Sequence, residues 1–156
     1  MPSREFLTHS SEETIALGRE LAAQLRPPVL LCLDGELGAG KTTLAKGIIS
    51  GLGVAREEEV TSPTFTLVHV FRNPSPSEAA GGLKVFHVDL YRVADRHDLE
   101  TLGLEDLFAE PAIVLVEWPD RLVLRTDWPI VRVHLEHREG DSRCICVTEP
   151  ACSEQS

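Results

Sequence analysis

The sequence of 156 residues has few basic side chains and no cluster of them. It carries 15 lysines and arginines against 25 aspartates and glutamates, which gives a formal net charge of −10 at pH 7. Proteins that bind nucleic acid tightly usually present a basic face, because contacts with phosphates supply much of their affinity. We therefore expect no DNA binding and no tight RNA binding by this chain alone. A role in RNA chemistry would depend on a protein partner.

Long hydrophobic runs are also absent. No apolar segment approaches the roughly 18 residues that span a bilayer, and residues 1–5 hold no apolar signal-peptide core. These absences predict a soluble, cytoplasmic protein with no contact to a membrane. The length is that of one domain with a core of its own, so we expect a single domain over residues 1–148 and a disordered tail over 149–156.

Cysteine is scarce, and its spacing does not build a metal site. Cys144 and Cys146 could suggest a pair of metal ligands, but they lie in an alternating strand pattern without a second ligand pair. Cys32 lies in an apolar run and Cys152 in the tail. We interpret them as ordinary thiols and expect no disulfides in a reducing compartment.

What the sequence does contain is a phosphate-binding loop, GELGAGKTT, at residues 35–43. An apolar run over 29–33 precedes it, and helical spacing follows it to about Gly53. A buried strand, a glycine turn and a helix N-terminus together let backbone N–H groups cradle a polyphosphate. The residues that we expect to contact the nucleotide are Leu37, Gly38, Ala39, Gly40, Lys41, Thr42 and Thr43.

Two side chains of the loop have definite chemistry. Lys41 can reach the β- and γ-phosphates, and the hydroxyl of Thr42 is placed to ligate Mg²⁺. Thr43 would support the α-phosphate side. An ordinary glycine-rich turn is the alternative, but the full pattern arises by accident in on the order of one in two hundred chains of this length.

Two further strands end in carboxylates. Along residues 84–91, His87 and Asp89 share one face with Tyr91, opposite an apolar face. This spacing fits a strand beside a binding site and equally an edge strand with its polar side in water. The second wholly apolar run, 112–118, includes Glu117 near its end, where a phosphate-loop protein has its second Mg²⁺ contact. From spacing alone, Asp89 and Glu117 are both candidates for the metal acid.

The remaining segments are assigned from their periodicity and their turn residues. We expect a strand at 4–9, a helix from the capping box Ser10–Glu13 to Arg26, an exposed loop at 56–61, a strand at 65–71, a flexible connection at 73–82, helical turns at 98–108, and a hairpin of strands at 129–136 and 143–148.

With these pieces in place, the chain resembles the TsaE family, small bacterial ATPases required for threonylcarbamoyladenosine modification of tRNA. Four motifs carry the resemblance: the loop at 35–43, SPTFTLV at 62–68, HVDLYR at 87–92 and EWP at 117–119. Their order and spacing fit over residues 6–148. The resemblance implies an α/β, P-loop NTPase-like three-layer fold with a mostly parallel central sheet plus antiparallel strands.

The resemblance also implies roles for individual residues. By it, Thr42 and Glu117 bind Mg²⁺, and Asp89 is a catalytic or switch residue near the γ-phosphate. A nucleotide-sensing loop and the surroundings of the base are implied as well. The residues concerned are Ser62 and Thr64 in the loop, Trp118 near the site, and Ser11, Asp120 and Gly140 around the base.

The family's partners are implied in the same way. A heterodimer of TsaD and TsaB transfers the threonylcarbamoyl group to adenosine 37 of tRNA, and TsaE docks on that heterodimer and hydrolyses ATP to reset it. The RNA would then be held mainly by the partners, which agrees with the acidic charge. No arginine finger is evident, so we expect slow hydrolysis by the chain alone.

Two other functions stay open at this point. A small-molecule kinase would share the phosphate loop, but it needs an acceptor pocket and usually an arginine-rich lid, for which Arg92 and Arg96 are too few. An ATP-binding docking module without significant hydrolysis would use most of the same residues. A GTPase is disfavoured, because the sequence has no Asn-Lys-x-Asp motif to read the base.

Overall fold

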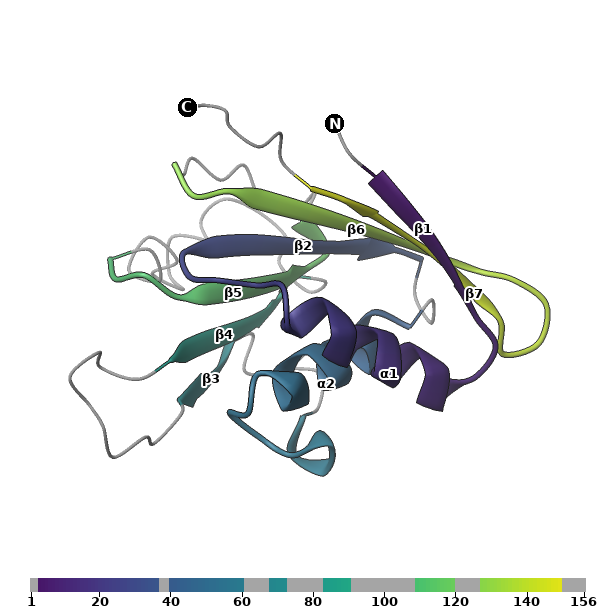
Figure 1. Cartoon of the computed structure of the whole chain (residues 1–156), viewed down its shortest axis with the longest axis horizontal. Helices are drawn as coiled ribbons and strands as arrows, with labels where there is room; N and C mark the ends of the chain where they lie inside the picture. The colour runs from purple at the N-terminus through teal and green to yellow at the C-terminus, as the bar shows by residue number, and fades with distance from the viewer. Residues whose placement is uncertain are drawn as a thin grey trace.

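The apolar runs of the sequence become strands of one mixed β-sheet (Figure 1). The computed structural model describes residues 3–36, 40–60, 68–72, 83–90, 109–119 and 127–149. The strands are β1 (Ser3–Thr8), β2 (Val29–Gly35), β3 (Val68–Arg72), β4 (Lys84–Asp89), β5 (Ile113–Glu117), β6 (Ile130–His137) and β7 (Arg143–Thr148). The helices are α1 (Ser11–Ala22) and α2 (Lys41–Gly51), and a 3₁₀ turn covers Glu57–Glu59.

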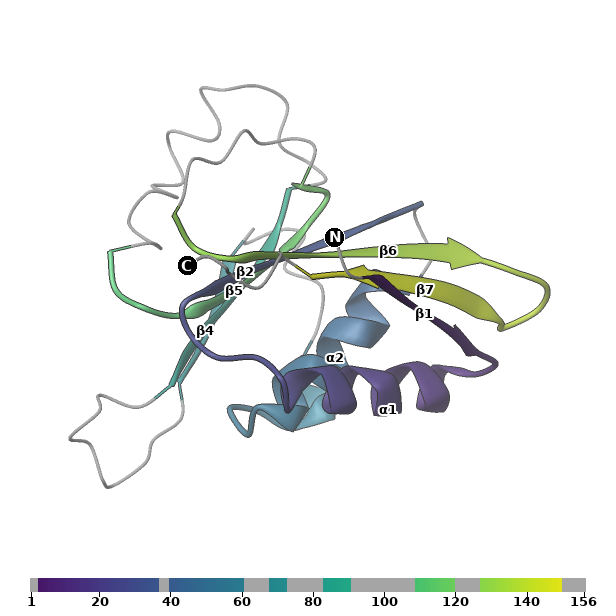
Figure 2. The same ribbon diagram turned by 45° about the horizontal axis from the view of Figure 1, so that its top comes forward.

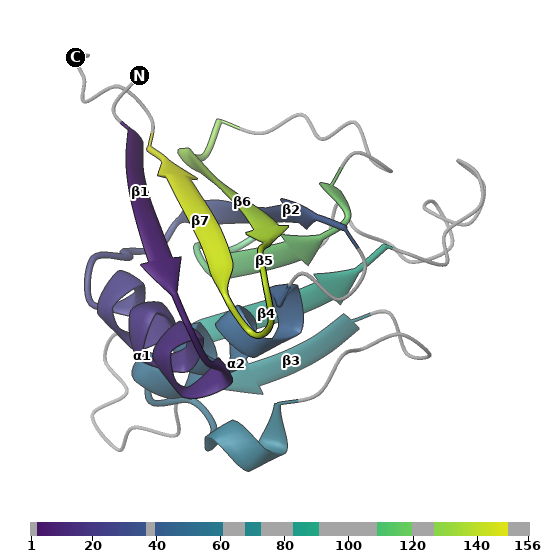
Figure 3. The same cartoon turned by 90° about the vertical axis from the view of Figure 1, so that its right-hand side faces the viewer.

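The strands follow the order β1-β7-β6-β2-β5-β4-β3, which Figure 3 shows from the side. The four inner strands, β6, β2, β5 and β4, run parallel to one another. Antiparallel strands extend this centre on both sides, with β7 and β1 beyond β6 and β3 beyond β4. The predicted α/β class, with a parallel centre and antiparallel extensions, is confirmed.

Both faces of the central strand β2 are buried. Leu31 and Leu33 face the helices, whereas Leu30 and Cys32 belong to a second apolar cluster on the opposite face. Strands buried on both faces need apolar residues at every position, and this explains why the run 29–33 lacks polar alternation.

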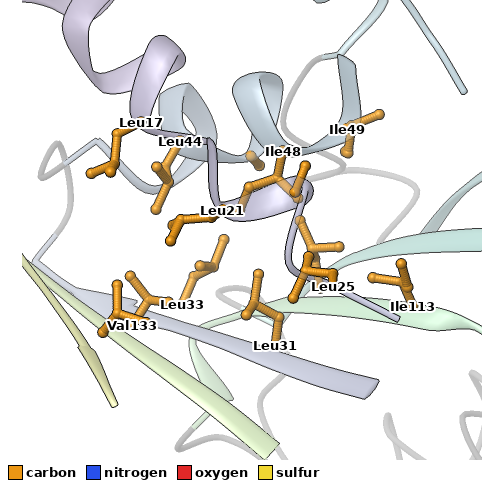
Figure 4. Close-up of a cluster of buried hydrophobic side chains, with 14 of the residues drawn as sticks. Leu17, Leu21, Leu25, Leu31, Leu33, Leu44, Ile48, Ile49, Ile113 and Val133 are labelled. Atoms are coloured by element: carbon orange, nitrogen blue, oxygen red, sulfur yellow. The ribbon is translucent and has the colours of Figure 1, made fainter. Parts of the chain in front are cut away.

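Helices α1 and α2 lie side by side on the same face of the sheet, as Figures 1 and 2 show. Figure 4 shows the cluster that joins them to it, formed by Leu17, Leu21, Leu25, Leu44, Ile48 and Ile49 from the helical layer and by Leu31, Leu33, Ile113 and Val133 from the strands. Burial of each such side chain contributes roughly 1.5–3 kcal/mol relative to exposure. The segment 98–108 lies outside the described residues, so a further helical layer stays a prediction.

The first helix begins as the sequence predicts and ends earlier. Ser10 Oγ accepts a hydrogen bond from the backbone N–H of Glu13 at 3.1 Å, as a capping box requires. The carboxylate of Glu13 accepts from the N–H of His9 at 2.7 Å rather than from that of Ser10. The helix ends at Ala22 instead of Arg26, because the N–H groups of Gln24 and Leu25 bond three residues back, to Leu21 and Ala22, and tighten the last turn.

The C-terminal hairpin is confirmed, whereas the loop after α2 differs from expectation. Strands β6 and β7 pair antiparallel around a turn in which Gly140 has a φ of +61°. The predicted exposed loop at 56–61 contains the 3₁₀ turn, and Val60 is fully buried in the core. The polar pattern gave no sign of this apolar anchor. The tail prediction lies mostly outside the described residues, although Glu149 is described and forms an ion pair with Arg4.

The interpretation of β4 as an edge strand is wrong. Strand β3 pairs with β4 on its outer side, so that β4 lies inside the sheet. His87 and Asp89 are buried, at 0% and 3% exposure. The polar face of this strand therefore points into the protein and not into water.

Two other expectations concern thiols and membranes. Cys32, Cys144 and Cys146 are free, and Cys152 lies outside the described residues. In the described part of the chain, no helix has the length and apolar character needed to cross a bilayer. The cytoplasmic location itself stays a prediction.

The two helices approach so closely that their backbones touch. A Cβ atom on Gly47 of α2 would lie 2.1 Å from the carbonyl oxygen of Ile15 in α1. On Gly18 of α1, it would lie 2.6 Å from the carbonyl oxygen of Leu44. Since α2 starts at the phosphate loop, this glycine contact fixes the helix that presents the loop.

We predict that Gly47→Ala destabilises the fold. Alanine favours a helix over glycine by about 1 kcal/mol, but overpacking typically costs about 1–3 kcal/mol and sometimes more. The clash is with a backbone oxygen that cannot rotate away, so the loss should exceed the gain. Denaturant unfolding of Gly47→Ala beside Lys46→Ala, which adds no atom near α1, measures the effect. An unchanged midpoint for Gly47→Ala would contradict the close packing.

Candidate nucleotide site

The predicted loop and both candidate acids meet at one edge of the sheet. Strands β2, β5 and β4 are parallel neighbours, so their carboxyl ends lie together. Glu117 pairs in register with Leu33 on one side and with Asp89 on the other. Ligands of open α/β sheets bind at this edge.

The backbone at the start of α2 is arranged to receive an anion. Gly40 is the N-cap, with a φ of +104° that glycine adopts without strain, and it supplies no side chain to cap the helix. The first N–H groups of a helix lack intrahelical acceptors, and the helix dipole is positive there. Lys41, Thr42 and Thr43 form this first turn. Residues 37–39, also predicted to contact the nucleotide, lie outside the described residues.

Lys41 is held within its own loop. Its side chain is 5% exposed, and Nζ donates hydrogen bonds to the carbonyl oxygens of Gly35 at 2.6 Å and Glu36 at 2.8 Å. Nζ also lies 4.1 Å from the ring centroid of Trp118, within the range of a cation–π interaction. Burial lowers the pKa of Lys41, and the negative charge of Glu117 opposes that shift most strongly.

Trp118 reaches this position through an unusual backbone. Its φ is +63°, in the left-handed region that residues other than glycine rarely occupy. It directly follows Glu117 at the end of β5, and its N–H donates to the carbonyl oxygen of Leu33 at 3.3 Å. The turn that places the ring against Lys41 is therefore the turn that ends β5. Trp118 thus lies beside Lys41, and its role in a nucleotide site stays a prediction.

The structure brings together the two expected metal ligands. Thr42 Oγ1 donates to the Glu117 carboxylate, at 3.3 Å from Oε1 and 3.1 Å from Oε2. His87 Nε2 lies 2.6 Å from Glu117 Oε2 on the other side. Glu117 itself is only 3% exposed.

This donor set fits Mg²⁺. The ion prefers oxygen ligands in an octahedral arrangement, and it usually relies on one or two protein side chains together with waters and substrate phosphates. The described residues contain no group of three or more His, Cys, Asp or Glu side chains that could hold a metal by themselves. The hydroxyl and carboxylate pair is therefore suited to an ion that arrives with a nucleotide.

The residues implied for the base are only partly described. Ser11 is the first residue of α1, and Gly140 lies in the turn between β6 and β7. These two segments are joined by a hydrogen bond between His9 Nδ1 and Ser142 Oγ at 3.2 Å. Their contact with a base stays a prediction. Asp120 lies outside the described residues, as do Ser62 and Thr64.

Sequence reasoning missed Arg143, the first residue of β7. A Cβ atom on Gly40 would lie 3.2 Å from Nε of Arg143, so this side chain lies against the N-cap of α2. Among the described residues, Arg143 forms no ion pair with a carboxylate. Only the register of the C-terminal hairpin reveals this position, because no motif surrounds the residue.

Comparison with known proteins gives a consistent result. Residues 8–145 match the family described as threonylcarbamoyl adenosine biosynthesis protein TsaE. A relative from Bacillus subtilis, named tRNA threonylcarbamoyladenosine biosynthesis protein TsaE, is 34% identical over 148 residues, which cover 95% of this chain and 87% of the relative. A relative of the same name from Mycobacterium tuberculosis is 40% identical over 131 residues, covering 80% of this chain and 74% of the relative.

A solved structure is also similar. The crystal structure of Bacillus subtilis YdiB matches this fold with a TM-score of 0.66 and 29% sequence identity, covering 95% of this chain and 86% of that one. The family match spans most of the chain and includes the loop, both acids and the strands that carry them. The chain therefore belongs to the TsaE family, which has a role in the biosynthesis of threonylcarbamoyladenosine in tRNA.

Proposed function

We propose that this chain binds and hydrolyses ATP, and that it does so as an accessory protein of the TsaD–TsaB complex that modifies adenosine 37 of tRNA. The observation that carries the proposal is the contact between Thr42 and the Glu117 carboxylate, beside Lys41 at the start of α2. Family membership indicates the tRNA modification pathway. The residues of the site support ATP binding and hydrolysis as the activity.

Each side chain at the site has a role in this proposal. The first turn of α2 binds the phosphates through its N–H groups, and Lys41 neutralises the charge that develops on them. Thr42 and Glu117 would hold Mg²⁺, which would neutralise negative charge on the phosphates. Asp89, in register with Glu117 and 3% exposed, orients the attacking water.

Arg143 supports nucleotide binding from the other side of the loop. It extends from β7, across β6 and β2 from the metal acids, and its guanidinium lies against Gly40. An arginine without a carboxylate partner among the described residues is available to pair with a phosphate. It stands away from Glu117, so it does not replace an arginine finger at the γ-phosphate.

The proposal includes slow hydrolysis by the chain alone and acceleration by the partners. Lys41 is already satisfied by its own loop, and ATP has to compete for it. We propose that docking on TsaD–TsaB supplies the missing transition-state group or acts on the loop at 56–66, as in other nucleotide switches. The tRNA is held mainly by those partners, since this chain has a net charge of −10.

Phosphate release from ATP–Mg²⁺ tests the proposal. The purified chain is measured alone and with the TsaD–TsaB pair, and Lys41→Ala is the control for a contaminating ATPase. We expect slow release alone and a clear rise with the partners. ATP binding without release in either condition would instead support a docking module that does not hydrolyse ATP.

We predict that Lys41→Ala lowers ATP affinity or abolishes turnover. Charge-assisted hydrogen bonds contribute about 1.5–3 kcal/mol, so the loss in affinity should be on the order of ten- to a hundredfold. Calorimetric titration with ATP–Mg²⁺ measures it. Lys46→Ala on the same helix serves as the matched control, because Lys46 belongs to no proposed contact. Undiminished turnover by Lys41→Ala would remove the proposed site.

We predict that Glu117→Ala weakens nucleotide binding only when Mg²⁺ is present. The variant loses a metal oxygen but keeps the backbone groups that bind phosphate. Binding of a non-hydrolysable ATP analogue, measured with Mg²⁺ and with EDTA, separates the two effects. Asp89→Ala is the comparison, and we expect it to slow turnover with a smaller change in metal dependence. The reverse result would make Asp89 the metal acid.

A further inference from the structure

The side chain of His87 lies closer to the Glu117 carboxylate than the side chain of Thr42 does. The ring is fully buried, on the face of β4 that points toward the helices, and its Nε2 lies 2.6 Å from Oε2 of Glu117. A carboxylate can only accept hydrogen bonds, so Nε2 is the donor. The bond reaches across from β4 to the end of β5.

The same carboxylate is held from a second direction. Thr42 donates from α2 to both oxygens of Glu117, whereas His87 donates from β4 to Oε2. A carboxylate that accepts a hydrogen bond from a single hydroxyl can still rotate about the bond to its carboxyl carbon. Because the imidazole also donates to Oε2, the orientation of the carboxylate plane is fixed. Oε1 is then left with only the longer contact, of 3.3 Å, to Oγ1 of Thr42.

Among the described residues, the imidazole of His87 has no second hydrogen bond that would explain its burial. Nδ1 of His87 is buried and has no hydrogen-bond partner within the described residues. The neighbouring ring of His69 packs edge-on, with centroids 6.4 Å apart, which is a packing contact. An apolar side chain would fill this space without leaving a nitrogen unsatisfied. The bond to Glu117 is therefore what distinguishes histidine at this position.

We propose that His87 is a positioning residue for the metal acid. It holds Oε2 of Glu117 so that Oε1 faces the Mg²⁺ that arrives with ATP. The inference rests on the proposed function and concerns the orientation of one carboxylate within that site. Residues that hydrogen-bond to a metal ligand and orient it typically change metal affinity by on the order of 10–100-fold.

Three variants test this role. His87→Leu removes the donor, and His87→Gln keeps an N–H donor on a side chain of similar reach. His69→Leu changes the adjacent ring, which does not contact Glu117. For each variant, binding of a non-hydrolysable ATP analogue is titrated against Mg²⁺ concentration and repeated in EDTA. Thermal unfolding without metal reports whether each variant is folded.

We expect His87→Leu to weaken Mg²⁺ binding on the order of 10–100-fold and to leave binding of the analogue in EDTA unchanged. His87→Gln should recover much of the loss, and His69→Leu should behave like the unmodified protein. Equal Mg²⁺ affinity for His87→Leu and the unmodified protein would overturn the proposal. So would a loss in His87→Gln as large as that in His87→Leu.

A measurement on the unmodified chain remains decisive if the variants do not fold. Nitrogen-15 spectra of the imidazole side chains report which ring nitrogen carries the proton. We expect the proton of His87 on Nε2, and a proton on Nδ1 alone would overturn the proposal. If the chain binds no ATP–Mg²⁺, the proposed function fails, and the spectrum still reports separately on the bond to Glu117.

Discussion

The buried carboxylate of Glu117 links the fold to the site. A carboxylate that is 3% exposed is costly without partners, because removal from water costs several kcal/mol. Thr42 and His87 provide those partners from α2 and from β4, while Glu117 itself ends β5. The three elements must therefore meet for the carboxylate to be stable. The same arrangement places together the hydroxyl and the carboxylate that would hold Mg²⁺ in the proposed function.

The sequence predicts the parts of the fold in which burial is complete. The runs 29–33 and 112–118 are apolar at nearly every position, and both become inner parallel strands. The sequence could not show whether the strand that carries His87 lies at the edge of the sheet or inside it. Alternation of polar and apolar residues looks the same for an exposed edge strand and for a strand whose polar face is buried. Pairing of β3 with β4 decides between them, and that pairing joins residues on both sides of the connection at 73–82.

The candidate site also has parts that the sequence predicts and parts that it does not. The places of Gly40, Lys41 and Thr42 at the start of α2 could be predicted, because a phosphate loop specifies backbone and side chains over a few positions, whereas their contacts with a nucleotide stay predictions. The choice of Glu117 as metal acid came from the family resemblance, and its contact with Thr42 is consistent with that choice. The position of Arg143 could not be predicted, because it depends on the register of β7 beside β6 and on the start of a helix a hundred residues earlier.

Lys41 is hydrogen-bonded to residues of its own motif, and this bears on the proposed binding of a nucleotide. Lys41 donates to two carbonyl oxygens and lies over the Trp118 ring. In the proposed function, phosphates would have to replace these contacts. The net gain from binding would then be the difference between two sets of contacts, which is smaller than the full strength of the new bonds. Trp118 holds a left-handed backbone directly after Glu117. A change of that backbone would move both the ring over Lys41 and the carboxylate of Glu117, so it would affect both of the contacts on which the proposed site depends.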